Sequence, residues 1–164
     1  MRLELRGIDV GERWQSIAKI CAGRTNDHAN PFASAHDAMV LAAVDEFRLI
    51  DELLASMRVH GSDKTSTVSN VTRSLGIPLV KAILAHRKGE HDYVVDLLWP
   101  IRRGFYQVGG SHAQRDVFFQ ILVHSAIQAN RSSQLSILLD DIAGTGFESV
   151  SERTLYKDAA ALAA

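Results

Sequence analysis

The chain has 164 residues, with 18 basic and 19 acidic side chains and a formal net charge of −1. This length suits one domain or a short array of repeats. Without a basic excess we expect no nucleic-acid partner, and without an apolar run near the roughly 18 residues that span a bilayer we expect no membrane partner.

The single cysteine, Cys21, excludes an internal disulfide framework and a zinc site built from several thiolates. It fits a reducing compartment, and the first residues lack the apolar segment of a signal peptide. We therefore expect a cytoplasmic protein. No glycine-rich phosphate-binding motif occurs, so the sequence predicts no cofactor.

Apolar residues recur at helical spacing along most of the chain, which predicts an all-α fold. The opening M-R-L-E-L-R-G is typical of a last helical turn closed by Gly7. Asp9, with Glu12 three residues later, matches a capping box, so we expect a helix from there to about Gly23. Asn30-Pro31 predicts the start of the second helix, because Asn is a favoured cap and Pro a favoured first residue.

A third helix is expected after a short turn near Asp45 and should end at Gly61, where G-S-D-K-T-S predicts a loop. The following helix contains Gly76-Ile77-Pro78. Because proline removes a donor and clashes with the preceding turn, the helix must break or kink there before it resumes toward Gly89.

Three further helices complete the prediction. The first runs from Tyr93 to about Ile101, with a kink expected at Pro100. Residues 112–129 and 135–142 have strong helical patterns, and Gly144 and Gly146 should end the second of them. We expect one repeat domain over residues 1–143, followed by a tail over residues 144–164 that contains a short helix.

A leucine motif repeats along the chain. R-L-I-D-E-L-L ends at Leu54, Y-V-V-D-L-L at Leu98 and Q-L-S-I-L-L at Leu139, at intervals of 44 and 41 residues, and a tight polar turn precedes each copy. A helix pair that recurs at this period predicts an α-solenoid of antiparallel helix pairs, with these leucines buried at equivalent positions. The alternative is an irregular helical bundle.

Several strings resemble known repeat proteins. K-G-E-H-D-Y-V-V-D-L-L resembles the turn between the two helices of a tetratricopeptide repeat. R-L-E-L-R-G-I-D-V-G-E-R-W, V-T-R-S-L-G-I-P-L-V-K-A-I-L-A and G-G-S-H-A-Q-R-D-V-F resemble the tetratricopeptide-repeat-38-like family.

These matches run in order from residue 2 to about residue 140 and correspond to the C-terminal part of the family's longer chain. Residues from about 144 onward do not follow the family's pattern. The resemblance implies a tetratricopeptide-like solenoid used for protein interaction. It implies no catalytic residues, because no catalytic activity is established for such proteins as a class.

The stretch G-G-S-H-A-Q-R-D-V-F, residues 109–118, contains the residue types of a nucleophilic triad in Ser111, His112 and Asp116. A simpler interpretation fits better. Ser111 and Gln114 have the spacing of a capping box, and the two preceding glycines permit a sharp turn. The stretch therefore predicts a helix start, and we expect no catalytic residue here.

A metal site is a second alternative. His112 and Asp116 are one turn apart on the same helix face, and His36 could add a third ligand. The seven histidines are scattered along the chain, however, and no H-E-x-x-H motif occurs, so we expect no metal site. A small hydrolase or metal-dependent enzyme centred on His36, His112 and Asp116 remains the alternative function.

The favoured function is the binding of a protein or peptide partner. In a solenoid the first helix of each pair lines the concave face, and here those helices lie within residues 32–42, 68–88 and 112–129. Arg115, with its planar fork of donors, is the residue best suited to hold a carboxylate from a neighbouring helix or a bound peptide. The polar side chains of these helices are the candidate binding residues: His36, Asp37, Asn70, Arg73, Lys81, His112, Arg115 and Asp116.

The N-terminal end suggests self-association. Leu3, Leu5, Trp14 and Ile17 are apolar and have no repeat before them in this sequence to cover them. Exposed apolar patches of this kind usually mark interfaces, so we expect a homodimer through this end. A self-assembling structural module is accordingly a third possible function.

Overall fold

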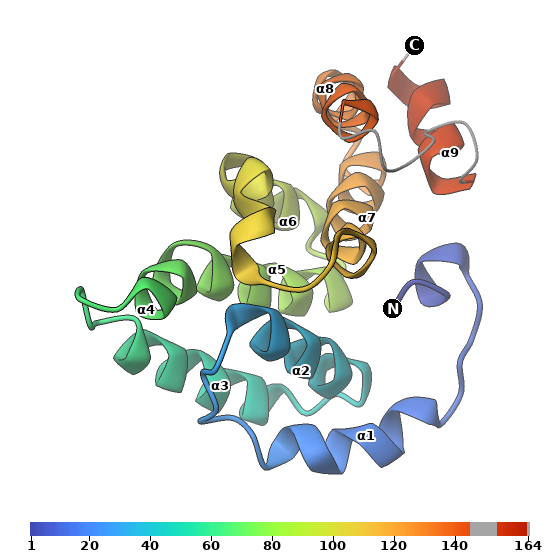
Figure 1. The fold of residues 1–164 in the computed structure, drawn as a ribbon. Coiled ribbons are helices and arrows are strands. Elements are labelled where there is room, and N and C mark those ends of the chain that lie inside the picture. The colour runs from blue at the N-terminus through green and yellow to red at the C-terminus, as the bar shows by residue number, and fades with distance from the viewer. Residues whose placement is uncertain (145–153, 164) are drawn as a thin grey trace.

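The computed structural model describes residues 1–144 and 154–163, and within these ranges it contains helices and no strands (Figure 1). The predicted all-α class is therefore confirmed. In chain order the elements are η1 (Glu4–Arg6), α1 (Arg13–Ala22), α2 (Pro31–Ala43), α3 (Phe47–His60), α4 (Thr67–Val71), η2 (Thr72–Gly76), α5 (Ile77–Arg87), α6 (His91–Leu98), η3 (Trp99–Val108), α7 (His112–Gln128), α8 (Ser132–Ala143) and α9 (Thr154–Ala163).

Most helix starts and ends lie where the sequence predicted them. The Asn30 side chain accepts a hydrogen bond from the Ala33 N–H at 2.8 Å, and Pro31 is the first residue of α2. The capping box predicted at Asp9 is wrong. Its carboxylate instead accepts from the Gly11 N–H at 2.7 Å in a tight local turn, and α1 begins only at Arg13.

The interruption predicted at Pro78 takes the form of a π-helical turn, η2, between α4 and α5. A wider turn accommodates a proline because it relieves the clash with the preceding carbonyl and does not need the missing N–H. Gly76 ends this turn directly against α2. A Cβ atom at Gly76 would lie 2.9 Å from Cβ of Pro31, so glycine permits the close approach of the two elements.

The expected kink at Pro100 is wrong. The α-helix ends at Leu98, and Trp99–Val108 forms a 3₁₀ segment, η3. Pro100 cannot donate the hydrogen bond that a continuing α-helix requires, so the chain changes helix type there. The predicted stop at Gly146 lies outside the described residues, while α8 ends at Ala143.

Most neighbouring helices pack together, namely α1 with α2, α2 with α3, α5 with α6, α6 with α7, α7 with α8 and α8 with α9. Helix α5 also packs against α2 and α3, and α9 packs against α7. Figure 1 shows α1, α2 and α3 at one end of the molecule and α8 and α9 at the other, with α5, α6 and α7 between them. Leu54, Leu98 and Leu139 are all buried in the core, as the leucine repeat predicted. No helix in the described ranges is long and apolar enough to cross a bilayer.

Leu98→Ala should lower the free energy of unfolding by about 2–5 kcal/mol, because the side chain is only 1 % exposed and its loss leaves a cavity. Urea denaturation followed by circular dichroism measures this change. The control is Ile137→Ala, whose side chain on α8 is 42 % exposed and whose loss should cost less than about 1 kcal/mol. Equal losses in the two variants would contradict the burial pattern.

Candidate functional site

The G-G-S-H-A-Q-R-D-V-F stretch forms the start of α7, as predicted. The Ser111 hydroxyl accepts from the Gln114 N–H at 3.3 Å, and the Gln114 side chain accepts from the Ser111 N–H at 2.8 Å. Gly110 has a φ of 75°, and a Cβ there would lie 2.6 Å from the ring of Phe32. The capping box is confirmed, and it commits the Ser111 hydroxyl to the backbone.

Asp116 is buried on α7 and holds together parts of the chain that are distant in sequence. Its carboxylate accepts a hydrogen bond from the Tyr156 hydroxyl of α9 at 2.8 Å and another from the Gln120 side chain. Arg2, near the N-terminus, lies 3.7 Å from the same carboxylate. Buried carboxylates need such partners, so Asp116 has a structural role.

Arg115 is hydrogen-bonded to no carboxylate in the described part of the chain, so of its two expected partners the neighbouring helix is not observed and a bound peptide stays a prediction. Its guanidinium group donates to the carbonyl of Gly110 and, at 3.3 Å, to that of Gly109. These bonds fix the turn before α7, and among the described residues the guanidinium group of Arg115 forms no ion pair with a carboxylate.

His36 and Asp37 are held inside the fold. His36 Nδ1 lies 2.9 Å from the carbonyl oxygen of Phe32, and its ring packs against the rings of Phe32 and Phe118. Burial lowers the pKa of His36, which favours the neutral ring. Asp37 is buried and accepts three hydrogen bonds from Arg24, at 2.8, 2.9 and 3.2 Å.

The remaining candidates lie on the α4–η2–α5 run. Arg73 donates to the Gly61 carbonyl at 2.6 Å and to the side chain of Asn70, so both residues fix the loop after α3. Lys81 is half-buried on α5. Several of the eight candidate residues thus form hydrogen bonds within the fold.

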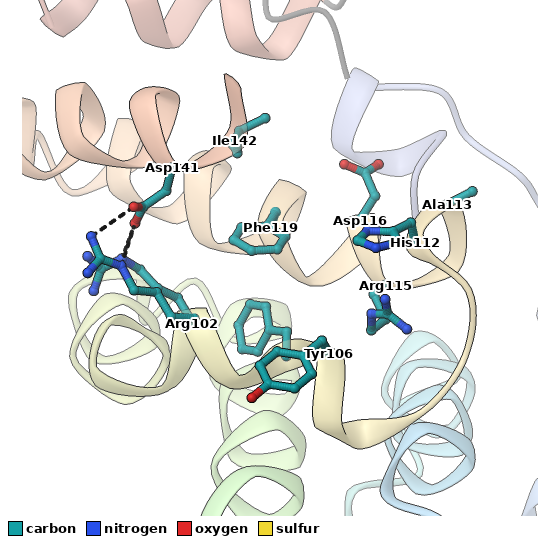
Figure 2. A pocket seen from close by; sticks show the side chains of 11 residues that line it. Arg102, Tyr106, His112, Ala113, Arg115, Asp116, Phe119, Asp141 and Ile142 are labelled. Carbon is teal, nitrogen blue, oxygen red and sulfur yellow. Dashed lines mark hydrogen bonds and ion pairs between the residues drawn. The ribbon is translucent and has the colours of Figure 1, made fainter. Parts of the chain in front are cut away.

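Three of the candidates, His112, Arg115 and Asp116, do line a shared cavity of about 470 Å³ between η3, α7 and α8. Figure 2 shows Arg102 with Asp141 at one end of this cavity and Arg115 with His112 at the other, with Tyr106 and Phe119 between them. The other lining residues are Arg103, Phe105, Ala113 and Ile142. We call it the η3–α7–α8 cavity.

One acidic residue organises two arginines at the edge of this cavity. Asp141 on α8 accepts from Arg102 Nε and from Arg103 Nη2, both at 2.9 Å. Burial raises the pKa of Asp141, but the hydrogen bonds and charges of Arg103 and Arg102 outweigh burial, so the pKa lies below its usual value. Arg102 also stacks over the Trp99 ring at 3.8 Å.

The alternative enzyme centre was expected at His36, His112 and Asp116. Within the described residues, His36, His112 and Asp116 do not form a group whose ligand atoms could share a metal ion. Ser111 and Asp116 both serve structural hydrogen bonds, in the capping box and with Tyr156, so the triad pattern has no support in the geometry.

Two features of the fold were missed by the sequence analysis. One is the pairing of the adjacent Arg102 and Arg103 with Asp141, which lies almost 40 residues later in the sequence and shares no motif with them. The other brings His86, His91 and His124 together from three helices. The five-residue spacing of the first two histidines across a predicted helical turn was the only available signal.

No protein-family model matches the chain, and no solved structure matches it. The resemblance to tetratricopeptide repeats therefore stays a prediction, and function must be inferred from the side chains.

Tyr156→Phe should lower the free energy of unfolding by about 1–3 kcal/mol, because it removes a hydroxyl donor from a buried carboxylate while keeping the ring. Thermal or urea denaturation measures the loss. The matched control is Tyr93→Phe on α6, where the side chain is 47 % exposed and little change is expected. A Tyr156→Phe protein as stable as the control would show that the Asp116–Tyr156 bond has no structural importance.

Proposed function

We propose that this chain is a non-enzymatic helical-repeat module that binds a segment of a partner protein in the η3–α7–α8 cavity. The observation that carries the proposal is the cavity itself, which combines an apolar floor with a positively charged edge. Phe105, Phe119 and Ile142 supply the floor, and Arg102, Arg103 and Arg115 supply the charge. Ligand sites commonly have this composition of apolar walls with a few placed polar groups.

The repeat architecture is part of the same proposal. We infer a tetratricopeptide-like solenoid in which α2 with α3, α5 with α6, and α7 with α8 are the helix pairs. Two observations support it: the two helices of each pair pack together, and the three leucines at equivalent repeat positions are all buried. The cavity then lies between the last pair and the 3₁₀ segment that precedes it.

The charges favour an acidic partner segment. Arg102 and Arg103 share the single carboxylate of Asp141, and Arg115 donates to backbone carbonyls. Three arginines thus line the cavity with two carboxylates, those of Asp141 and the buried Asp116, so the lining carries more positive than negative charge. Arginine is well suited to bind a second carboxylate, because its planar fork offers several donors at once.

The aromatic lining of the cavity favours a partner segment that has a large apolar or aromatic side chain next to its acidic residue. Phe105 is fully buried, Phe119 packs against it with ring centroids 5.0 Å apart, and Tyr106 is 67 % exposed at the cavity. Such aromatic groups typically contribute most of the binding energy at protein interfaces. We expect a bound segment to place a large apolar side chain against Phe119 and Tyr106.

We also propose a cytoplasmic location. Cys21 is buried, and its pKa is raised to about 12 by burial and by the hydrogen bond and charge of Asp37. The thiol is therefore unreactive, which is consistent with a reducing compartment.

Selection from a displayed library of random peptides tests the binding proposal. Enriched peptides should carry a large apolar residue close to Asp or Glu. For a synthetic enriched peptide, Arg103→Ala and Tyr106→Ala should each weaken binding about tenfold in fluorescence anisotropy, because both side chains are exposed at the cavity.

The matched control is Arg58→Ala, which removes an exposed arginine from α3 and should change the affinity less than about twofold. Enriched peptides without acidic residues, or equal weakening by Arg58→Ala and Arg103→Ala, would refute the proposed site.

Self-association through the N-terminal end stays a prediction. Of the four residues in that expectation, Leu5 and Trp14 pack against the core, while Leu3 and Ile17 are exposed. Ile20 adds to the exposed apolar surface of α1. Light scattering should show a dimer that Ile20→Lys converts to a monomer, because burying a charged side chain in an apolar interface has a large desolvation cost. A monomer at high concentration of the unsubstituted chain would exclude this interface.

A further inference from the structure

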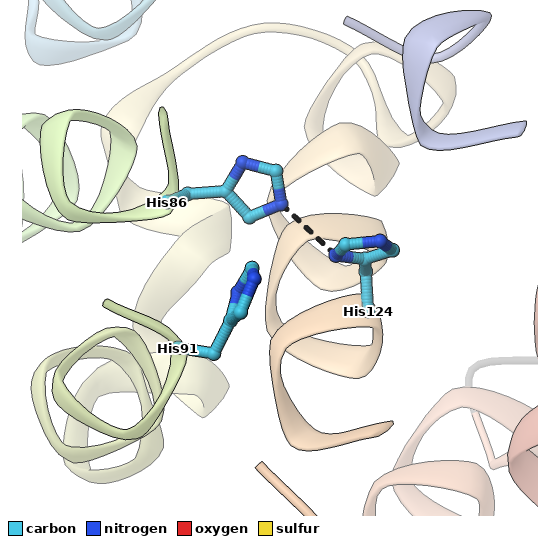
Figure 3. A group of neighbouring side chains, drawn as sticks. All are labelled: His86, His91 and His124. Atoms are coloured by element: carbon cyan, nitrogen blue, oxygen red, sulfur yellow. Dashed lines mark hydrogen bonds between the residues drawn. The ribbon is translucent and has the colours of Figure 1, made fainter. Parts of the chain in front are cut away.

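Three histidines from three helices converge on one space beside α7 (Figure 3). His86 lies in the last turn of α5, His91 is the first residue of α6, and His124 lies on α7. The tight turn at Gly89, with a φ of 75°, folds α6 back so that His91 faces His86. Ring centroids are 5.0 Å apart for His86 and His124, and 5.5 Å for each of the other two pairs.

The nitrogen atoms are placed as metal ligands would be. His86 Nε2 and His124 Nδ1 are 3.1 Å apart, and one nitrogen from each of the three rings lies within 4.8 Å of the other two. Tetrahedral zinc with Zn–N bonds of about 2.0–2.1 Å holds its nitrogen ligands about 3.3–3.4 Å from one another. One pair already has this spacing, and a shift of about 1.5 Å brings in the third nitrogen.

We propose that His86, His91 and His124 bind one Zn²⁺ ion, which joins the α5–α6 helix pair to α7. Three imidazole nitrogens are a donor set that zinc prefers, and three histidine ligands with an open fourth position form a known type of zinc site. This inference is independent of the peptide-binding proposal, because none of the three histidines lines the η3–α7–α8 cavity.

The surroundings keep the rings neutral, as metal binding requires. Burial, together with the neighbouring His124 and His91, lowers the pKa of His86 to about 3, so this ring is unprotonated at neutral pH. Burial also lowers the pKa values of His91 and His124. Zinc binding then requires the proton shared in the His86–His124 hydrogen bond to move to the other nitrogen of its ring, so that both facing nitrogens offer lone pairs.

A supporting group holds one ligand in place. The Oγ atom of Ser125, which is fully buried on α7, lies 3.4 Å from Nδ1 of His91. Metal-binding histidines usually have such a partner on the second ring nitrogen, which fixes the ring and its tautomer. In the proposed zinc-bound form, Nδ1–H of His91 donates to Ser125 Oγ and Nε2 carries the lone pair that binds the ion.

The fourth position of the ion would border a small cavity of about 180 Å³, lined in part by Glu4, His86 and His124. Charges around the site are balanced. Arg87 lies 3.6 Å from the Glu4 carboxylate, and Asp92 follows His91 and pairs with Arg131 at 2.9 Å. The opening is wide enough for a water ligand, and the Glu4 carboxylate there is paired with the N-terminal ammonium group of Met1, 2.6 Å away, as well as with Arg87.

The test uses the full 164-residue chain with any affinity tag removed. Isothermal titration with Zn²⁺ should give one site per chain, and elemental analysis after dialysis should give one zinc atom. Added Zn²⁺ should raise Tm by several degrees, because the ion binds only the folded arrangement of the three histidines. Co²⁺, used as a spectroscopic probe, should show the strong visible absorption of a tetrahedral nitrogen site.

Variants locate the site. His91→Gln and His124→Gln should each weaken zinc binding at least about 100-fold and remove the Co²⁺ absorption, while Ser125→Ala should weaken binding about tenfold. The matched control is His60→Gln. His60 is also half-buried and packs on another histidine, His28, with ring centroids 5.0 Å apart, so the control removes a comparable ring outside the cluster.

Zinc binding that is lost in His91→Gln and kept in His60→Gln supports the site. Two results would overturn it: no zinc binding by the unsubstituted chain at micromolar concentrations, or equal binding by His91→Gln and His60→Gln. Because His91 is half-buried at a helix start, its variant is expected to fold, and circular dichroism checks this.

Discussion

The buried carboxylate of Asp116 is the constraint on which the arrangement of this chain depends. A carboxylate removed from water must be hydrogen-bonded, and two of the three partners of Asp116 come from distant parts of the chain. Tyr156 donates from α9, Gln120 from the next turn of α7, and Arg2 lies 3.7 Å away at the N-terminal end. Satisfying one side chain therefore holds both ends of the chain against the same helix. A residue whose type suggests catalysis acts here as a structural connection.

Helix α7 contributes residues to both proposed sites. Its first turns face η3 and α8 across the cavity that we assign to a partner segment. Further along, His124 faces the ends of α5 and α6. Because an α-helix rises 1.5 Å per residue, Asp116 and His124 are separated by about 12 Å along the helix axis. A zinc ion at His124 would fix α7 to the preceding helix pair, and that pair leads into η3, which lines the cavity. The two sites are thus linked through one rigid element and the segment η3, although they share no side chain.

Part of the fold was predictable because it depends on neighbours in sequence. The cap at Asn30, the capping box at Ser111 and the interruption before Pro78 each involve groups within a few residues, so residue type and spacing are sufficient. The two wrong predictions, at Asp9 and at Pro100, also concern interactions between residues close in sequence. Asp9 had two local hydrogen-bonding choices, a turn or a helix cap, and sequence alone does not rank them. At Pro100 the chain changed to a 3₁₀ segment, an outcome that residue type alone does not distinguish from a kink.

The sequence by itself determined the all-α class, most helix boundaries and the burial of the repeated leucines, because periodicity and capping are properties of short segments. Only the tertiary structure decided which polar side chains meet. Asp141 forms ion pairs with Arg102 and Arg103, almost 40 residues away in sequence, and His124 is hydrogen-bonded to His86 at a similar separation. Such pairs depend on how helices pack, and packing is set by the sum of many apolar contacts that no short motif records.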